Sequence, residues 1–191
     1  MSQAATGLTT LDKVKRYVSP KAGTETGTHD DLIRDLIAQV TDEIEVGIGA
    51  KLLKASYTDT LDGWVNEYLV LLHRPVIDFT KLELNGVVVT ASTYQVNKPA
   101  GLVVQVTDGA PTAWTPGTRN YVATYTAGYV TIPGGLERIA TRVVARALET
   151  SSKGRIGKSA ESLSTGGTVD FDPDLISDAE WKTLRNYGAL V

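Results

Sequence analysis

The stretch from Tyr121 to Ser151 constrains the fold most, because a strand, a turn and a long amphipathic helix follow one another in it without a break. β-Favouring residues alternate with a period of two as far as Thr126, which predicts a strand. The strand ends at Gly128, and Pro133 has a backbone angle that is compatible with a helix start. Apolar residues then recur at helical spacing on one face, at Leu136, Ile139, Ala140, Val143, Val144, Ala147 and Leu148. We expect this face to be buried within the subunit, as the centre of the fold.

Two further helices are predicted before this one. Thr9 or Thr10 can cap a short helix near the start of the chain, and Thr28 can cap a second, longer helix. Gly47 and Gly49 are interpreted as the end of the second helix. Its apolar stripe consists of Leu32, Ile33, Leu36, Ile37, Val40, Ile44 and Ile48. The two helices and the Leu136 helix can form a small bundle.

The region from Ala55 to Thr126 has the pattern of a sheet rather than of helices. Asp62-Gly63 and Asn85-Gly86 match two-residue hairpin turns, which require positive φ. Strands are expected at Tyr68 to Leu72, Leu82 to Leu84, Val87 to Val89, Tyr94 to Val96 and Leu102 to Val106. The order helix, helix, sheet, helix predicts an α+β fold, with a hairpin-rich antiparallel β insertion between the second and third main helices.

The carboxyl-terminal segment is expected to be an extended arm that ends in a short helix. Ser151 to Thr168 is rich in Ser, Gly, Thr and Lys, a composition typical of a segment that orders only against a partner. Ser177 and Glu180 form a capping box for the last helix. The expected parts are residues 1–54 for the amino-terminal helices, 55–128 for the β insertion, 129–152 for the main carboxyl helix and 153–191 for the arm.

Composition excludes several classes of function. The chain has no cysteine, which rules out disulfides and thiolate chemistry. No apolar run reaches the roughly 20 residues of a membrane span, and the amino terminus lacks a signal sequence, so we expect a protein that stays in the cytoplasm. A net charge of −3 gives no overall attraction to nucleic acid.

Charge is strongly segregated near the carboxyl terminus. Leu136 to Lys158 has a net charge of +4, and Arg138, Arg142 and Arg146 share one face of the predicted helix. Glu161 to Glu180 contains six acidic residues and no basic one. We hypothesise that the acidic arm of one subunit lies on the basic helix of a neighbour or on a partner ring, with Trp181 as an apolar anchor. The expected contact residues are Arg138, Arg142, Arg146, Arg155, Lys158, Asp170, Asp172, Asp174, Trp181, Leu184 and Tyr187.

Two other interpretations of this charge pattern remain open. The basic helix face and the arm can simply be solvated, as most charge runs are. Alternatively, the arginines can line a channel that contains DNA, because phosphates bind basic side chains without sequence preference.

Apparent enzyme motifs lack the structural context that they need. Ser152 to Ser159 comes within one residue of a P-loop, but it leaves a helix and enters a polar arm, whereas phosphate binding needs a strand before the loop and a helix after it. His29 lies beside acidic residues at a helix start, where adjacent side chains do not converge on one metal ion. The sequence places no serine or carboxylate beside His73. We therefore expect no enzyme activity, no metal and no cofactor.

Several short motifs resemble the head-to-tail connector proteins, or adaptors, of long-tailed bacteriophages and prophages. They are Leu8 to Lys15, the Asp31 to Ile48 helix, Leu72 to Val76, Tyr125-Thr126-Ala127-Gly128-Tyr129 with Pro133, Gly157 to Ser162, and the terminal Trp181, Leu184 and Tyr187. The β insertion is longer here than in the most compact members of that family.

This resemblance implies a structural virion protein of the neck, assembled in the cytoplasm of the host bacterium. Family members form a ring, commonly a dodecamer, under the portal protein, and they provide the docking surface for a tail or head-closure protein. Genomic DNA would pass through the lumen without sequence-specific binding. The alternatives are a monomeric β-rich binding module of a tail or baseplate and, last, a P-loop-like nucleotide hydrolase.

Overall fold

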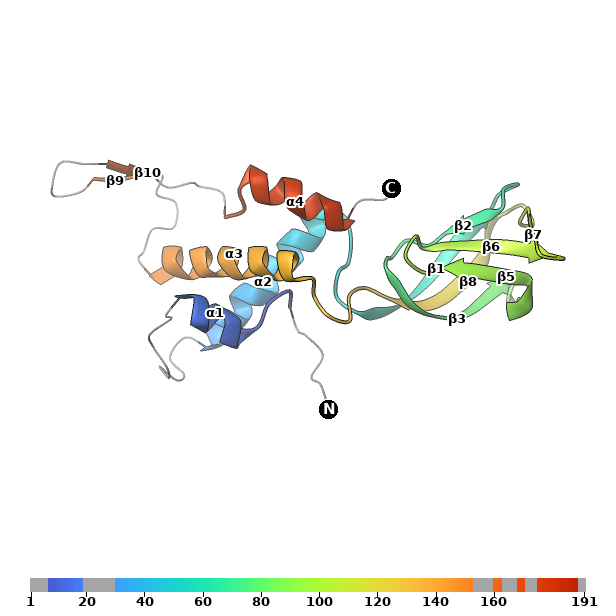
Figure 1. Ribbon diagram of the computed structural model, residues 1–191, viewed down its shortest axis with the longest axis horizontal. Coiled ribbons are helices and arrows are strands. Elements are labelled where there is room, and N and C mark those ends of the chain that lie inside the picture. Colours follow the sequence, from blue (N-terminus) through green and yellow to red (C-terminus); the bar gives the residue numbers. More distant parts are fainter. Residues whose placement is uncertain (1–6, 19–29, 153–159, 163–167, 171–174, 189–191) are drawn as a thin grey trace. The chain divides into compact units, whose positions relative to one another are not determined.

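The chain has an α+β fold that divides into two compact units. The computed structural model describes residues 7–18, 30–152, 160–162, 168–170 and 175–188. One unit, here called the helical unit, comprises residues 1–49 and 132–191, and the other, the β unit, comprises residues 50–131. The sheets are thus inserted between the second and third helices, as the order of sequence patterns predicted (Figure 1).

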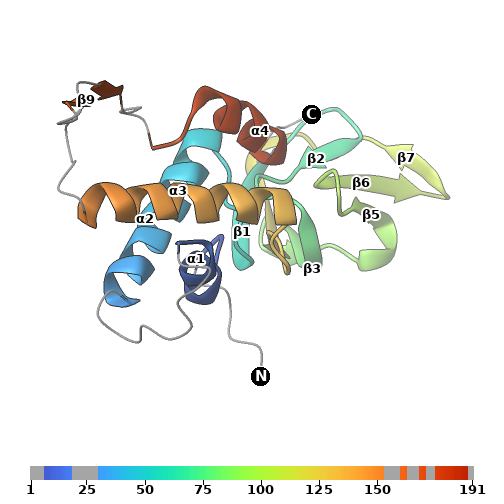
Figure 2. The same ribbon diagram turned by 60° about the vertical axis from the view of Figure 1, so that its left-hand side comes forward.

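The helical unit is organised around its third helix. The helices are α1 (Leu11–Val18), α2 (Asp30–Ile48), α3 (Gly134–Ser152) and α4 (Asp178–Gly188). α1, α2 and α4 each contact α3, and α3 crosses α2 in both views (Figures 1 and 2). The first three helices therefore form the bundle that the sequence predicted. α4 packs on α2 and α3 as a fourth helix.

The apolar face of α3 fills the core of the helical unit. Its buried residues are Leu136, Ile139, Ala140, Val143, Val144 and Ala147. α2 contributes Ile33, Ile37, Val40 and Ile44 to the buried set, and α1 contributes Val14. Each large side chain contributes about 1.5–3 kcal/mol when it is fully buried. The prediction that this face is buried within the subunit is confirmed.

The segment before α1 is held by both long helices. Leu8 is fully buried, and its backbone N–H donates to Thr41 Oγ1 of α2 at 3.1 Å. Thr9 Oγ1 lies 2.7 Å from Thr141 Oγ1 of α3. Thr9 therefore attaches the segment before α1 to α3.

The β unit consists of two antiparallel sheets. The first has the strand order β1 (Ala55–Gly63), β8 (Gly117–Ala127), β3 (Val76–Leu84) and β4 (Val87–Val88). The second has the order β2 (Tyr68–Val70), β6 (Leu102–Thr107) and β5 (Tyr94–Asn97), and β7 (Ala110–Thr112) also pairs with β6. A short 3₁₀ turn, Ala91–Thr93, precedes β5. In the carboxyl-terminal segment, β9 (Ala160–Ser162) pairs with β10 (Thr168–Asp170), where the sequence predicted an arm without strands.

The core of the β unit lies along β8. Alternate residues of this strand are buried, at Tyr121, Ala123, Tyr125 and Ala127. They pack with buried residues of both sheets and of a loop, namely Leu61, Leu69, Leu71, Val76, Leu82, Val103 and Trp114. The period of two in the sequence therefore identified the inward face of β8.

One predicted hairpin turn is confirmed and another is wrong. Asn85 and Gly86 have φ values of 51° and 81° and connect β3 to β4. Asp62-Gly63 is instead the end of β1. A Cβ at Gly63 would lie 2.1 Å from the carbonyl oxygen of Thr115, so close backbone approach explains this glycine. Asp108-Gly109, with φ values of 52° and 81°, forms a turn between β6 and β7 that the sequence analysis missed.

A buried carboxylate joins the two sheets at the end of β2. Asp59 of β1 is 5% exposed, and its Oδ2 accepts hydrogen bonds from the Tyr125 hydroxyl and, at 3.0 Å, from the backbone N–H of Leu72. The N–H of His73 donates to the Tyr125 hydroxyl at 3.0 Å. Burial, followed by the hydrogen bond to Asp59, raises the pKa of Tyr125. Asp59 Oδ1 also lies 3.9 Å from His73 Nε2, so the structure places beside His73 a carboxylate that the sequence analysis could not.

Replacing Tyr125 with Phe tests this network. The substitution removes a donor from buried Asp59, and we expect the free energy of unfolding to fall by about 1–3 kcal/mol. Urea denaturation measures this change. Tyr68→Phe is the matched control, because Tyr68 is 46% exposed, and it should change stability by less than about 0.5 kcal/mol. Equal effects of the two substitutions would contradict the assigned role of Tyr125.

Candidate contact surface of the helical unit

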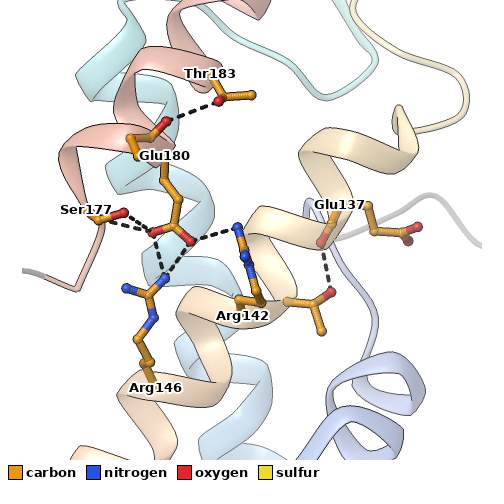
Figure 3. Close-up of polar contacts among 8 residues, drawn as sticks. Glu137, Arg142, Arg146, Ser177, Glu180 and Thr183 are labelled. Atoms are coloured by element: carbon orange, nitrogen blue, oxygen red, sulfur yellow. Dashed lines mark hydrogen bonds and ion pairs between the residues drawn. The ribbon is translucent and has the colours of Figure 1, made fainter.

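The basic side of α3 carries the residues that the sequence predicted to make contacts. Arg138, Arg142 and Arg146 follow one another at intervals of four residues, which brings them to one side of the helix. Arg138 is exposed, whereas Arg142 and Arg146 are half-buried. α4 lies against this side of α3 (Figure 3).

Glu180 of α4 binds two of these arginines. Arg146 Nη2 lies 2.6 Å from both carboxylate oxygens of Glu180, and Arg142 Nη2 lies 3.0 Å from Oε1 (Figure 3). The backbone N–H and the hydroxyl of Ser177 donate to Oε2 at 3.1 and 3.0 Å. This is the predicted capping box, and the carboxylate that closes it also holds α4 to α3.

The surroundings of Glu180 favour the ionised carboxylate. Its side chain is 8% exposed, and burial alone would raise its pKa. Hydrogen bonds from Arg146 and Ser177 outweigh burial, so the pKa of Glu180 is lowered overall. Burying the Glu180 carboxylate without these donors would cost roughly several kcal/mol. The donors from α3 therefore favour the position of α4 against that helix.

Trp181 packs on a glycine of α2. A Cβ at Gly47 would lie 2.2 Å from Cη2 of the indole ring, so only glycine leaves room for the ring. Gly47 lies inside α2, which continues to Ile48, and Gly49 follows with a φ of 67°. The predicted position of the helix end is therefore confirmed, and Gly49 has the positive φ of a helix terminus, whereas the sequence did not show that Gly47 makes room for Trp181.

The remaining predicted contacts of α4 also lie within the same chain. Leu184 is fully buried, and the hydroxyl of Tyr187 would lie 2.7 Å from a Cβ at Gly135. The sequence predicted Trp181 as an anchor in a neighbour, whereas the structure packs it on α2 of its own chain. Glu180, which was not among the predicted contact residues, is the acidic partner of the arginines. Only its capping-box spacing could have drawn attention to it.

The structure leaves part of the predicted contact set untested. Arg155, Lys158, Asp172 and Asp174 lie outside the described residues, and Asp170 is described only as part of β10. α3 continues to Ser152, so the P-loop-like motif does follow a helix, and the rest of that motif also lies outside the described ranges. Contacts of this set with another subunit therefore remain a prediction.

The described residues contain no cluster of three or more His, Asp or Glu side chains that could bind a metal ion. None of their helices is long and apolar enough to cross a membrane.

Comparison with known proteins finds similarity at the level of structure. No protein-family model matches the chain, and no curated protein matches its sequence. A chain of the neck of an empty gene transfer agent particle, computed with C6 symmetry, aligns with a TM-score of 0.62 and 16% identity. That alignment covers 100% of this chain and 94% of the other. The protein shares the fold of this neck chain.

Two further solved structures give similar alignments. A chain from the virion of the native gene transfer agent particle has a TM-score of 0.62 and 13% identity, with 100% of this chain and 94% of that one covered. A chain from the native neck computed with C12 symmetry has a TM-score of 0.60 and 14% identity, with 100% and 93% covered. The similarity includes both the helical unit and the β unit, because the alignments cover the whole chain.

Replacing Gly47 with Ala tests the packing of Trp181. Alanine favours a helix interior by about 1 kcal/mol over glycine, but the new methyl group would overlap the indole ring. We expect net destabilisation by about 1–2 kcal/mol, because overpacking costs more than the helix gains. Urea denaturation provides the measurement. Gly134→Ala is the control, because nothing lies within 4 Å of a Cβ there, and it should be neutral or stabilising. A stabilised Gly47→Ala variant would contradict this assignment.

The pH dependence of stability tests the Glu180 site. Because the folded-state pKa lies below the ordinary value of 4.5, the contribution of Glu180 is complete above that value and is lost as the pH falls towards the folded pKa. Glu180→Gln should lower stability at pH 7 by about 1–2 kcal/mol, since the two guanidinium groups are partly exposed. It should also reduce the loss of stability below pH 4.5. Urea midpoints at several pH values check both effects, with exposed Glu43→Gln as control. Parallel pH profiles for the wild type and Glu180→Gln would refute this account.

Proposed function

We propose that the chain is a structural subunit of a virion neck, a head-to-tail connector that assembles into a ring. The observation that carries this proposal is the match of fold over 100% of the chain to chains of gene transfer agent necks and virions. The short motifs that resemble phage connectors support the same conclusion from the sequence. Neither source of support depends on the other.

The proposed ring contains identical subunits in head-to-tail contact. The neck structures to which the chain is similar were computed with C6 and C12 symmetry, and we propose a closed ring of twelve subunits for this protein also, in line with the family resemblance. Rings arise when two different surfaces of a subunit are complementary, since repeated contact around an axis then closes.

The proposed partners are the portal protein on one side of the ring and a tail or head-closure protein on the other. Arg138 is the part of the basic face of α3 that remains exposed when Glu180 binds Arg142 and Arg146. It can meet carboxylates of a neighbour or of the portal. In this proposal DNA passes through the lumen without base-specific contacts, since contacts between basic side chains and phosphates carry no sequence information.

The proposed mechanism is contact geometry rather than catalysis. The buried polar residues described above are satisfied by partners within the chain, as Glu180 and Asp59 illustrate. These contacts hold helices and sheets together. The protein would act in the neck of the particle after assembly in the host cytoplasm.

Electron microscopy of the purified protein, alone and with portal rings of the same phage, tests the proposal. We expect ring-shaped particles seated on the portal. Arg138→Glu should weaken this assembly about tenfold, which is typical of a contributing interface residue. Lys54→Glu, the control, makes the same charge change at an exposed residue of the β unit. If the protein stayed monomeric under all these conditions, the proposed function would be wrong.

A further inference from the structure

An open groove lies between two strands that belong to different sheets of the β unit. It has a volume of about 830 Å³ and is lined mainly by β1, by β2 and by the loop between them. Its lining includes Asp62 of β1, Trp64 of the loop, and Tyr68 and Val70 of β2. Trp114 supports the loop from behind, because its backbone N–H donates to the carbonyl of Asn66 and its indole N–H to that of Glu67. The groove is therefore bounded by ordered backbone.

Both strands beside the groove have an edge that no other described strand pairs with. β1 is the first strand in the order β1-β8-β3-β4, and β2 is the first in the order β2-β6-β5. An edge strand presents backbone N–H and C=O groups that an added strand can bind. β1 is nine residues long, which is enough for several such bonds.

Apolar side chains gather along this groove. Trp64, Tyr68, Val70 and Leu72 are 64%, 46%, 48% and 65% exposed. Together they present an apolar area on the order of 400 Å², given that a large aromatic side chain covers roughly 150–250 Å². That area is typical of the largest patch on a monomer and is about half of the ~800 Å² that each partner contributes to a stable interface. The exposed apolar area beside the groove is thus large enough to form a main part of a stable interface.

The other end of the first sheet carries a second exposed apolar group. β4 is the last strand in the order and pairs only with β3 among the described strands. Its two residues, Val87 and Val88, are 70% and 61% exposed. They follow the Asn85-Gly86 turn, and no residue from Asn85 to Thr90 is charged. This hairpin tip can therefore enter the groove without bringing a charge of its own into it.

We propose that the β3–β4 hairpin tip of one subunit docks in the β1–β2 groove of a second copy of this chain. The proposal rests on the proposed function, because it supplies the head-to-tail contact that a ring requires. The two surfaces differ and lie at the two ends of one sheet, so each subunit can offer its tip to one neighbour and its groove to the other. Backbone pairing extends the sheet between subunits, and the valines cover Trp64 and Tyr68.

Charge favours a second copy over a basic or acidic peptide as the occupant. The charged residues in the groove lining are Asp59, Asp62 and Arg119. Asp59 already accepts hydrogen bonds from Tyr125 and Leu72, and Asp62 accepts one from the N–H of Arg119. The groove thus offers little net charge to a charged ligand, whereas the uncharged hairpin tip can cover its exposed apolar side chains.

Cross-linking of single-cysteine variants tests the contact directly, because the natural chain has no cysteine. Val70→Cys in the groove and Val88→Cys in the hairpin tip are prepared separately, mixed and treated with a short bis-maleimide reagent. We expect a cross-linked dimer that contains one chain of each variant. The mismatched control pairs Val70→Cys with Val46→Cys, a residue of the helical unit that is 71% exposed. Cross-linking of the first mixture at no more than the control level overturns the proposal.

A second measurement follows assembly without cross-linking. Val88→Lys places a charge on the edge strand, and it should raise the protein concentration for half-maximal ring formation about tenfold. Val130→Lys, at a residue of the β unit that is 69% exposed and outside both surfaces, should not change it. If rings form normally but Val70 and Val88 do not cross-link, this inference is overturned and the proposed function stands. If no rings form even with portal, the proposed function is overturned. If there are neither rings nor the cross-link, both are overturned.

Discussion

The ionised Glu180 carboxylate is the polar interaction on which the packing of α4 against α3 depends. A buried carboxylate is costly unless several donors surround it, and here the donors come from Arg142, Arg146 and Ser177. These donors are together only when α4 lies on α3. Gly47 completes the arrangement by leaving space for Trp181 on α2, so one carboxylate and one missing side chain determine where the last helix packs.

Internal packing decides which surfaces remain for other molecules. The apolar face of α3 and two of its three arginines are used within the chain, which leaves Arg138 as the exposed member of the row. In the β unit, the exposed apolar side chains gather at two strand edges rather than over a broad face. Under the proposed function, these edges are the surfaces through which neighbouring subunits would assemble.

Local patterns in the sequence predicted much of the fold. The helical spacing from Leu136 to Ala147 identified the buried face of α3, the alternation in β8 identified its inward face, and Asn85-Gly86 identified a hairpin. The features that were missed depend on residues far apart in the chain. Gly63 is required by the carbonyl of Thr115, Gly47 by Trp181, and Asp59 of β1 meets His73 in the loop that follows β2. Periodicity carries no information on such contacts, and a charge pattern alone cannot tell whether its partner is the same chain or a neighbour.

Hydrogen exchange of the α4 amides as a function of protein concentration tests the central claim, that α4 docks on α3 of its own chain. The measurement spans concentrations from assembled protein down to monomer, with the mass followed by sedimentation. If docking is intramolecular, residues 178–188 keep the same protection from exchange at every concentration. Loss of that protection on dilution to monomer would show that α4 requires a neighbour and would contradict the account.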